Sequence, residues 1–164
     1  CEQANRRLIS ALTERFSSRM QIGAGTVLTV REAEAAVDAG ASFLISPGAD
    51  ERVIAKTRQL GAVSIPGALT PTEIVAAWQA GADFVKLFPV GALGPGYVKA
   101  VRAPLAHIPM LAVGGVTLEN IPAFLKSGVS GFGVGGSILA GASTGELSAV
   151  TQTARAYVQA VQGC

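Results

Sequence analysis

Residues 83–89 of the sequence read Asp83-Phe84-Val85-Lys86-Leu87-Phe88-Pro89, a short apolar run that contains one lysine. Its length, its aromatic residues and the glycines that flank it indicate a buried β-strand and not a turn of helix. Side chains alternate between the two faces of a strand, so Phe84, Lys86 and Phe88 are expected to share one face. The sequence therefore predicts a buried strand that places a lysine between two phenylalanines.

Lys86 is the candidate for the chemistry. Burying an ammonium group removes its water, which costs free energy and lowers the pKa of the amine. A lysine with a lowered pKa is a nucleophile near neutral pH, and groups of this kind concentrate in active sites. The alternative is a lysine at the end of a strand whose ammonium group reaches solvent. We predict that Lys86 is the catalytic residue.

Short apolar segments and amphipathic segments alternate on both sides of this strand. Each apolar segment ends at a breaker, and a helix followed by glycine leads to the next one. Strand–helix alternation of this kind predicts a parallel sheet with right-handed crossovers. We predict strands at 20–27, 43–47, 63–66, 84–89, 110–113 and 131–134, and helices at 2–18, 31–39, 50–60, 72–80, 96–106, 118–127 and 146–162.

Local signals mark where the helices begin and end. Thr70-Pro71-Thr72-Glu73 is a capping box with proline at the first helical position, so Glu73 is predicted to cap a helix and not to act as a base. The first helix carries an apolar stripe of Leu8, Leu12 and Phe16. Four glycines are predicted to stop helices, namely Gly40, Gly61, Gly81 and Gly128.

A larger repeat of strand end, capped helix, glycine stop and second strand is visible three times along the chain. A (βα)8 barrel needs four such quarters and typically about 250 residues. This chain has 164 residues and opens on a helix. We therefore predict an α/β fold of the (βα)8 TIM-barrel type, a single domain over 1–164 with about six of the eight strands and an incomplete N-terminal side. A six-stranded doubly wound sheet is the alternative.

Composition and charge argue against several classes of protein. Hydrophobic residues make up 49% of the chain and the net charge is +2, with the basic residues scattered, so nothing indicates nucleic-acid binding. No apolar run has the length of a membrane span and the start does not resemble a signal peptide, so we expect a cytoplasmic protein. The two cysteines are Cys1 and Cys164, and the only histidine, His107, precedes a strand. We expect neither a metal site nor a cofactor.

Glycine clusters follow the last two predicted strands, at Gly114-Gly115 and at Gly135-Gly136-Ser137. In barrels the loops at this position often bind phosphate through backbone N–H groups, and Ser137 could add a hydroxyl donor. The alternative is a pair of tight turns without a ligand. Thr26 follows another strand at the same rim, and its sequence context fits a substrate contact and a plain turn residue equally well.

Seven motifs occur in one order along the chain: Gly23-Ala24-Gly25-Thr26-Val27, Ser46-Pro47-Gly48, Ile65-Pro66-Gly67, Thr70-Pro71-Thr72-Glu73, Lys86-Leu87-Phe88-Pro89, Gly114-Gly115-Val116 and Gly135-Gly136-Ser137. Together they resemble the class I aldolases of 2-keto-3-deoxy-6-phospho sugar acids, the KDPG/KHG aldolase family. Ala112-Val113-Gly114-Gly115 resembles the 2-dehydro-3-deoxy-6-phosphogalactonate branch, because the gluconate branch usually has Pro-Thr before this glycine pair.

The resemblance implies a retro-aldol reaction in which Lys86 forms a Schiff base and pyruvate and D-glyceraldehyde 3-phosphate are released. It places Thr26 at the pyruvate end, Phe88 beside the lysine, and Val113 near the sugar hydroxyls that distinguish the galactonate and gluconate epimers. The family is usually trimeric, which implies a homotrimer. The implied phosphate cradle consists of Gly114, Gly115, Gly136 and Ser137.

The family's general acid/base, a glutamate on its second strand, and an arginine from its first two strands have no matching position in this sequence. A chain with Lys86 but without that glutamate is expected to form imines and turn over slowly, because proton transfer typically contributes about 10²–10⁴-fold. Two further hypotheses remain. One is a truncated or engineered barrel fragment that binds phosphate or self-assembles without turnover. The other is another phosphate-binding barrel, such as an epimerase or a thiamin-phosphate synthase relative, which the Lys-Leu-Phe-Pro strand disfavours.

Overall fold

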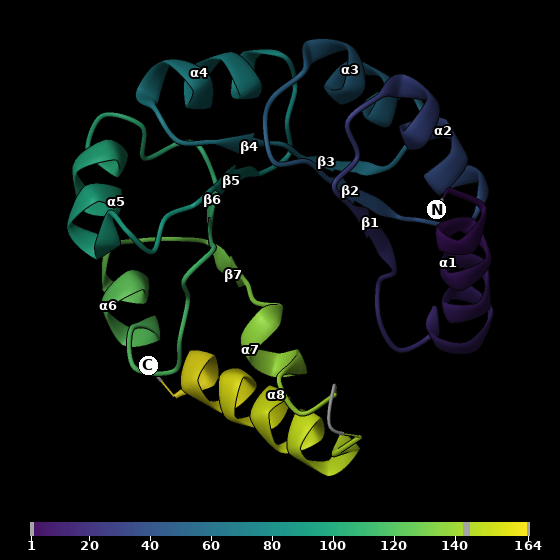
Figure 1. Cartoon of the computed structure of the whole chain (residues 1–164). Coiled ribbons are helices and arrows are strands. Elements are labelled where there is room, and N and C mark those ends of the chain that lie inside the picture. Colours follow the sequence, from purple (N-terminus) through teal and green to yellow (C-terminus); the bar gives the residue numbers. More distant parts are fainter. Residues whose placement is uncertain (1, 143–144, 164) are drawn as a thin grey trace. The chain divides into compact units, whose positions relative to one another are not determined.

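A computed structural model describes residues 2–142 and 145–163, in which strands and helices alternate along the chain (Figure 1). The terminal cysteines, Cys1 and Cys164, lie outside the described residues. The chain divides into two compact units, Cys1–Lys86 and Leu87–Cys164. Each unit is built from strands whose helices follow them in sequence, as the alternation predicts.

The first unit contains a three-stranded sheet in the order β1-β2-β3. The three strands are parallel, with Gly23 opposite Phe43 and Phe43 opposite Val63. A further short strand, β4, is hydrogen-bonded to β5. The elements of this unit are α1 (Glu2–Phe16), β1 (Gly23–Gly25), α2 (Val30–Asp38), β2 (Phe43–Ile45), α3 (Glu51–Gln59), β3 (Val63–Ile65), β4 (Gly67–Ala68) and α4 (Pro71–Gln79), followed by β5 (Val85–Leu87), whose last residue begins the second unit.

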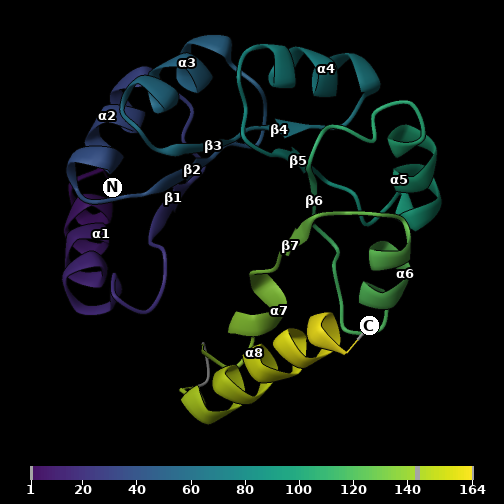
Figure 2. The same ribbon diagram turned by 180° about the vertical axis from the view of Figure 1, so that it is seen from behind.

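The second unit contains the parallel pair β6 and β7, with Leu111 opposite Gly131. The long helix α8 packs against α6 and α7, and both views of the ribbon show α8 beside α7 (Figure 2). Its elements after β5 are α5 (Gly94–Arg102), β6 (Met110–Val113), α6 (Ile121–Lys126), β7 (Gly131–Gly133), α7 (Gly136–Leu139) and α8 (Leu147–Gln162).

Every predicted strand and helix has a counterpart. The strand predicted at 110–113 has the predicted bounds, and the other five predicted strands are shorter than predicted. The region 20–27 contributes only Gly23–Gly25, and 84–89 contributes only Val85–Leu87. Two elements were not predicted, the strand Gly67–Ala68 and the four-residue helix Gly136–Leu139. Pro66 separates β3 from β4, and proline has no N–H to donate to a ladder, so one sequence segment becomes two strands.

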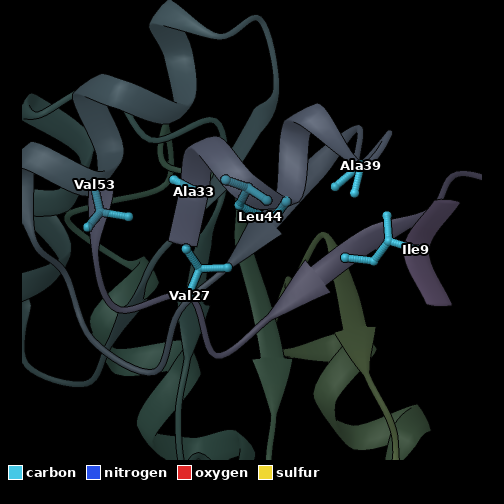
Figure 3. Packing of buried hydrophobic residues seen from close by; sticks show 8 residues of the cluster. Ile9, Val27, Ala33, Ala39, Leu44 and Val53 are labelled. Carbon is cyan, nitrogen blue, oxygen red and sulfur yellow. The ribbon is translucent and has the colours of Figure 1, made fainter. Parts of the chain in front are cut away.

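A cluster of small and branched apolar side chains forms the core of the first unit (Figure 3). The stripe predicted for the first helix is wrong at Leu8, which is 59% exposed, whereas Ile9 is 8% exposed and joins the cluster. The side chains of adjacent helix residues point about 100° apart. The surface against which the helix packs therefore decides which of the two is buried. The cluster consists of Ile9, Val27, Ala33, Ala36, Ala39, Ala41, Leu44 and Val53.

The predicted glycine stops are confirmed. At the end of α2, Gly40 donates its N–H to the Val37 carbonyl at 2.8 Å and Ala41 donates to the Ala36 carbonyl at 3.0 Å. This pair of bonds requires a left-handed residue, and Gly40 has φ +103°. The other three stops have positive φ and the same bond from the glycine N–H: Gly61, Gly81 and Gly128.

The capping role predicted for Glu73 is also confirmed. The Glu73 carboxylate accepts hydrogen bonds from the backbone N–H groups of Leu69 and Thr70 at 2.9 and 2.8 Å, and its own N–H donates to Thr70 Oγ1 at 3.3 Å. These bonds lower the pKa of the Glu73 carboxyl, the bond from Thr70 N–H having the largest effect. A carboxylate held in this way is a poor candidate for a base.

We expect Thr70→Ala to lower the free energy of unfolding by about 1 kcal/mol, because α4 loses the side chain that caps its N-terminus. Urea unfolding followed by circular dichroism measures the change. The control is Thr72→Ala. Thr72 is exposed and lies two residues after Thr70, inside α4, where it makes no cap. The stability of this variant should be unchanged or slightly higher, because alanine has the better helix propensity. Equal losses in both variants would contradict the capping assignment.

In the part of the chain that the structure describes, helices long and apolar enough to cross a membrane are not found.

Candidate active site

Lys86 lies in the middle of β5 between two fully buried residues, Val85 and Leu87, each 0% exposed. Its own side chain is half-buried, and its backbone N–H donates to the Pro66 carbonyl at 2.8 Å. The predicted alternation is confirmed, but the fully buried face is that of Val85 and Leu87. The lysine face is partly open, since Phe88 is 36% exposed. The Lys86 side chain is therefore partly buried and partly exposed.

Burial lowers the pKa of the Lys86 amine, as the sequence predicts. The cause is desolvation, because the ammonium form loses more hydration than the neutral amine does. A lower pKa increases the fraction of neutral amine near pH 7, and only the neutral amine has the lone pair that attacks a carbonyl carbon. The direction of this shift is the one a nucleophilic lysine needs.

Thr26 follows β1 and has a backbone conformation that its sequence context does not reveal. Its φ is +60°, and it is the one non-glycine residue with positive φ among residues 2–142 and 145–163. Non-glycine residues in this region cost about 1–3 kcal/mol and cluster at functional sites. The exposed Thr26 lines a cavity of about 160 Å³ in the first unit, together with Asn5, Arg6 and Glu32. The strained backbone favours the functional interpretation of Thr26 over that of a plain turn.

In the second unit, the turn after β6 contains two consecutive left-handed residues, Gly114 at φ +83° and Gly115 at φ +80°. This turn packs directly against Gly91, whose N–H donates to the Gly114 carbonyl at 2.8 Å. A Cβ on Gly115 would lie 2.8 Å from Gly91 Cα. The two backbones are this close only because positions 91 and 115 are both glycine. The Phe88 ring packs on the same turn, because a Cβ on Gly114 would lie 3.1 Å from its Cδ2 and Cε2 atoms.

The turn after β7 leads into α7 and carries Gly136 and Ser137. A Cβ on Gly136 would meet no atom within 4 Å, so the backbone here is open to a ligand. Ser137 is exposed. Val113, the last residue of β6, lies close to the neighbouring strand, because a Cβ on Gly133 would come within 2.8 Å of its Cγ2 methyl.

Tyr157 of α8 connects the two glycine turns, and it is not among the site residues predicted from the sequence. Its hydroxyl lies 3.0 Å from Ser137 Oγ and 3.4 Å from the Val116 carbonyl oxygen. Tyr157 is 7% exposed. A signal was present in the sequence, because a tyrosine on the apolar face of a helix needs a partner for its hydroxyl. The identity of that partner depends on tertiary structure.

The single histidine of the chain precedes a strand, as the sequence predicts. His107 is exposed in the connection that enters β6. Trp78 on α4 and Tyr97 on α5 are half-buried helix residues. Within the described residues, His, Cys, Asp and Glu side chains do not gather in groups of three or more that could hold a metal ion.

The two units hold different parts of the predicted site. The first unit contains Thr26 at the end of β1 and Lys86 in β5, which belong to different sheets. In the second unit, hydrogen bonds and packing connect the other candidates to one another through Gly91, Gly133, Val116 and Tyr157. The candidates of the second unit are Phe88, Val113, Gly114, Gly115, Gly136 and Ser137.

A family model of KDPG and KHG aldolases matches residues 3–153 of the chain. The chain belongs to the KDPG and KHG aldolase family. Among curated relatives of this aldolase chain, the 2-dehydro-3-deoxy-6-phosphogalactonate aldolase of Escherichia coli K12 is 36% identical over 157 residues, which cover 94% of this chain and 77% of the relative. Aldolases are carbon–carbon lyases, so this is a family of enzymes.

Two solved structures resemble the aldolase chain throughout most of its length. A structure described as native KDPGal has a TM-score of 0.88 and 36% identity, covering 94% of this chain and 75% of that one. The KDPG aldolase from Legionella pneumophila, with pyruvate captured at low pH as a covalent carbinolamine, has a TM-score of 0.82 and 26% identity, covering 90% and 73%. The fold is therefore α/β of the (βα)8-barrel type, as predicted, and not a doubly wound sheet.

Proposed function

We propose that this chain is a class I aldolase that cleaves 2-dehydro-3-deoxy-6-phosphogalactonate to pyruvate and D-glyceraldehyde 3-phosphate. The observation that carries the proposal is Lys86, a half-buried lysine with a lowered pKa on β5 of a KDPG/KHG aldolase chain. The Legionella relative supports the chemistry, because its structure contains pyruvate as a carbinolamine. A carbinolamine forms when an amine adds to a carbonyl carbon.

The proposed reaction begins when the neutral Lys86 amine attacks C2 of the substrate and forms a carbinolamine. Loss of water gives a protonated imine between Nζ and C2. The imine accepts the electron pair of the C3–C4 bond as that bond breaks, while the C4 hydroxyl loses its proton to water and becomes the aldehyde of glyceraldehyde 3-phosphate. The resulting enamine takes up a proton at C3, and water then releases pyruvate and the free amine. Lys86 is the nucleophile of this reaction, and the protonated imine that it forms is the electron sink.

We assign phosphate binding to the two glycine turns of the second unit. Gly114 and Gly115 have the positive φ that presents backbone groups without side chains, and the backbone at Gly136 is open. The exposed Ser137 hydroxyl supplies a further donor to the phosphate. Phe88, packed on the Gly114 turn, forms an apolar wall beside these donors.

Thr26 is proposed to bind the carboxylate or carbonyl at the pyruvate end of the substrate. Its exposed hydroxyl can donate to either group, and its left-handed backbone fixes the direction of the side chain. We also propose that the enzyme is a homotrimer, as is usual in the family, which light scattering on the purified chain can test.

Val113 is the residue proposed to set the preference for the galactonate epimer. We expect Val113→Thr to change the ratio of kcat/KM for the gluconate epimer to that for the galactonate epimer by about tenfold, in favour of gluconate, because threonine restores a hydroxyl contact to the sugar. Coupled assays on both pure epimers give the ratio. The control is Val98→Thr, the same substitution at a buried position of α5, which should leave the ratio unchanged. A ratio unchanged by Val113→Thr, in a variant that still turns over, would contradict the assignment.

The experiment that tests the function itself is a lactate-dehydrogenase-coupled assay of pyruvate release from each epimer. The proposal predicts pyruvate release from the galactonate epimer, with a glyceraldehyde 3-phosphate yield equal to that of pyruvate. Release of neither product from a folded protein would contradict the proposal and leave phosphate binding without turnover as the better account.

A further inference from the structure

We propose that Tyr157 is a positioning residue for the phosphate site, and that its hydroxyl holds the Ser137 hydroxyl in the orientation that donates to phosphate. This inference rests on the proposed phosphate cradle. It adds a residue from α8 to that cradle, whereas the phosphate donors themselves come from the two glycine turns. The three groups involved, Tyr157, Ser137 and Val116, all belong to the second unit.

Because Tyr157 is buried, its hydroxyl depends on its two hydrogen-bond partners. A buried hydroxyl without a partner costs free energy, so a 7% exposed tyrosine is held where its hydroxyl is satisfied. Its polar neighbours are Ser137 Oγ at 3.0 Å and the Val116 carbonyl at 3.4 Å. The first distance is ordinary for a pair of hydroxyls and the second is long, so Ser137 is the stronger partner.

The donor and acceptor inventory gives the direction of these bonds in each state. A phenol has one proton, and the Val116 carbonyl can only accept. Without an anion, Tyr157 can donate to Val116 and accept the proton of Ser137. When phosphate binds, the Ser137 proton turns to the anion, and Ser137 Oγ then accepts the Tyr157 proton. The tyrosine therefore supports the serine in both states, and bonds in a chain of this kind strengthen one another.

The position of Tyr157 also links the two turns of the cradle. Val116 directly follows the Gly114–Gly115 turn, and Ser137 is the second residue of α7. One hydroxyl on α8 thus contacts both turns, which are separated from it by 41 and 20 residues in sequence. Because α8 packs against both α6 and α7, its placement can set the spacing of the phosphate donors.

The test is a titration with inorganic phosphate, followed by the amide shifts of Gly115, Gly136 and Ser137 in ¹⁵N-labelled protein. This readout needs no turnover. We expect Tyr157→Phe, which keeps the ring, to weaken phosphate binding about three- to tenfold, the usual effect of losing one neutral hydrogen bond. The matched control is Tyr97→Phe, which removes the hydroxyl of the chain's other tyrosine and should leave the Kd for phosphate unchanged.

A double-mutant cycle separates positioning from a general structural effect. In the Ser137→Ala background, Tyr157→Phe should weaken phosphate binding no further, because the hydroxyl that it positions is gone. The rate of pyruvate trapping by borohydride should be the same in Tyr157→Phe and in the parent, because pyruvate has no phosphate. An equal effect of Tyr157→Phe in both backgrounds, an unchanged Kd, or a matching loss of pyruvate trapping would overturn the inference.

The same measurements distinguish the failure of this inference from failure of the proposed aldolase. A parent chain that shows no phosphate-dependent shifts at the three amides overturns both the cradle and the role of Tyr157, whatever its activity. A parent chain that binds phosphate there but neither traps pyruvate nor cleaves substrate contradicts the aldolase alone. In that case the response of phosphate binding to Tyr157→Phe still decides the positioning role.

Discussion

Replacing Lys86 with alanine should lower kcat/KM for the phosphogalactonate substrate by about 10³-fold or more, because the substitution removes the atom that forms the covalent intermediate. The loss should appear in kcat and not only in KM, since the residue acts on the reacting carbon. The coupled assay measures both constants. Circular dichroism and thermal unfolding establish that the variant is folded.

The matched control is Lys99→Ala, an exposed lysine on α5, which should leave turnover unchanged. The pH dependence is a second check on Lys86. Because burial lowers its pKa, the rate of imine formation with pyruvate should rise with pH and level off below the pKa of about 10.4 that an unperturbed lysine shows. A rate that keeps rising beyond that pH, or full activity in Lys86→Ala, would contradict its assignment as the nucleophile.

Replacing Gly115 with alanine should lower the free energy of unfolding by about 2–4 kcal/mol. Two costs combine in this estimate: about 1–2 kcal/mol for a left-handed residue with a Cβ, and about 1–2 kcal/mol, the lower part of the overpacking range, for forcing that Cβ against a packed backbone. The second cost arises because the new atom would lie 2.8 Å from Gly91 Cα. Urea unfolding of the parent and the variant measures the difference.

Gly94→Ala is the matched control for the cost of placing a Cβ on a left-handed residue. Gly94 lies in the same unit and has φ +72°, but a Cβ there would meet no atom within 4 Å. Gly94→Ala should therefore lower the free energy of unfolding only by the cost of a left-handed residue with a Cβ, about 1–2 kcal/mol. The prediction is that Gly115→Ala is clearly the more destabilising of the two. Equal losses would mean that the Gly91 contact contributes nothing and that the turn is free to move.

Much of the architecture could be predicted from the sequence because it depends on local chemistry. The Thr70–Glu73 capping box and the stop at Gly40 each satisfy backbone groups within a few residues, and both appear as predicted. Signals of this range remain the same in any tertiary context. The lowered pKa of Lys86 is also confirmed, but its cause is burial, a tertiary property that the apolar neighbours in the strand indicate only indirectly.

The features that sequence reasoning missed depend on contacts between distant residues. Leu8 and Ile9 are adjacent and equally apolar, and only the packing of α1 on the first unit's core selects Ile9. The requirement for glycine at Gly115 comes from Gly91, which belongs to a different turn. Tyr157 meets Ser137 across 20 residues. The left-handed backbone of Thr26 has no signal in its residue type, because threonine is disfavoured there.

The central claim is that Lys86 forms a covalent imine with a 2-keto acid. Incubating the chain with pyruvate and borohydride, and then locating the reduced adduct by intact mass and peptide mapping, tests it most directly. The account predicts one adduct per chain, on the peptide that contains Lys86, and no adduct in Lys86→Ala. A folded protein without an adduct, or an adduct on another lysine that persists in Lys86→Ala, would contradict it.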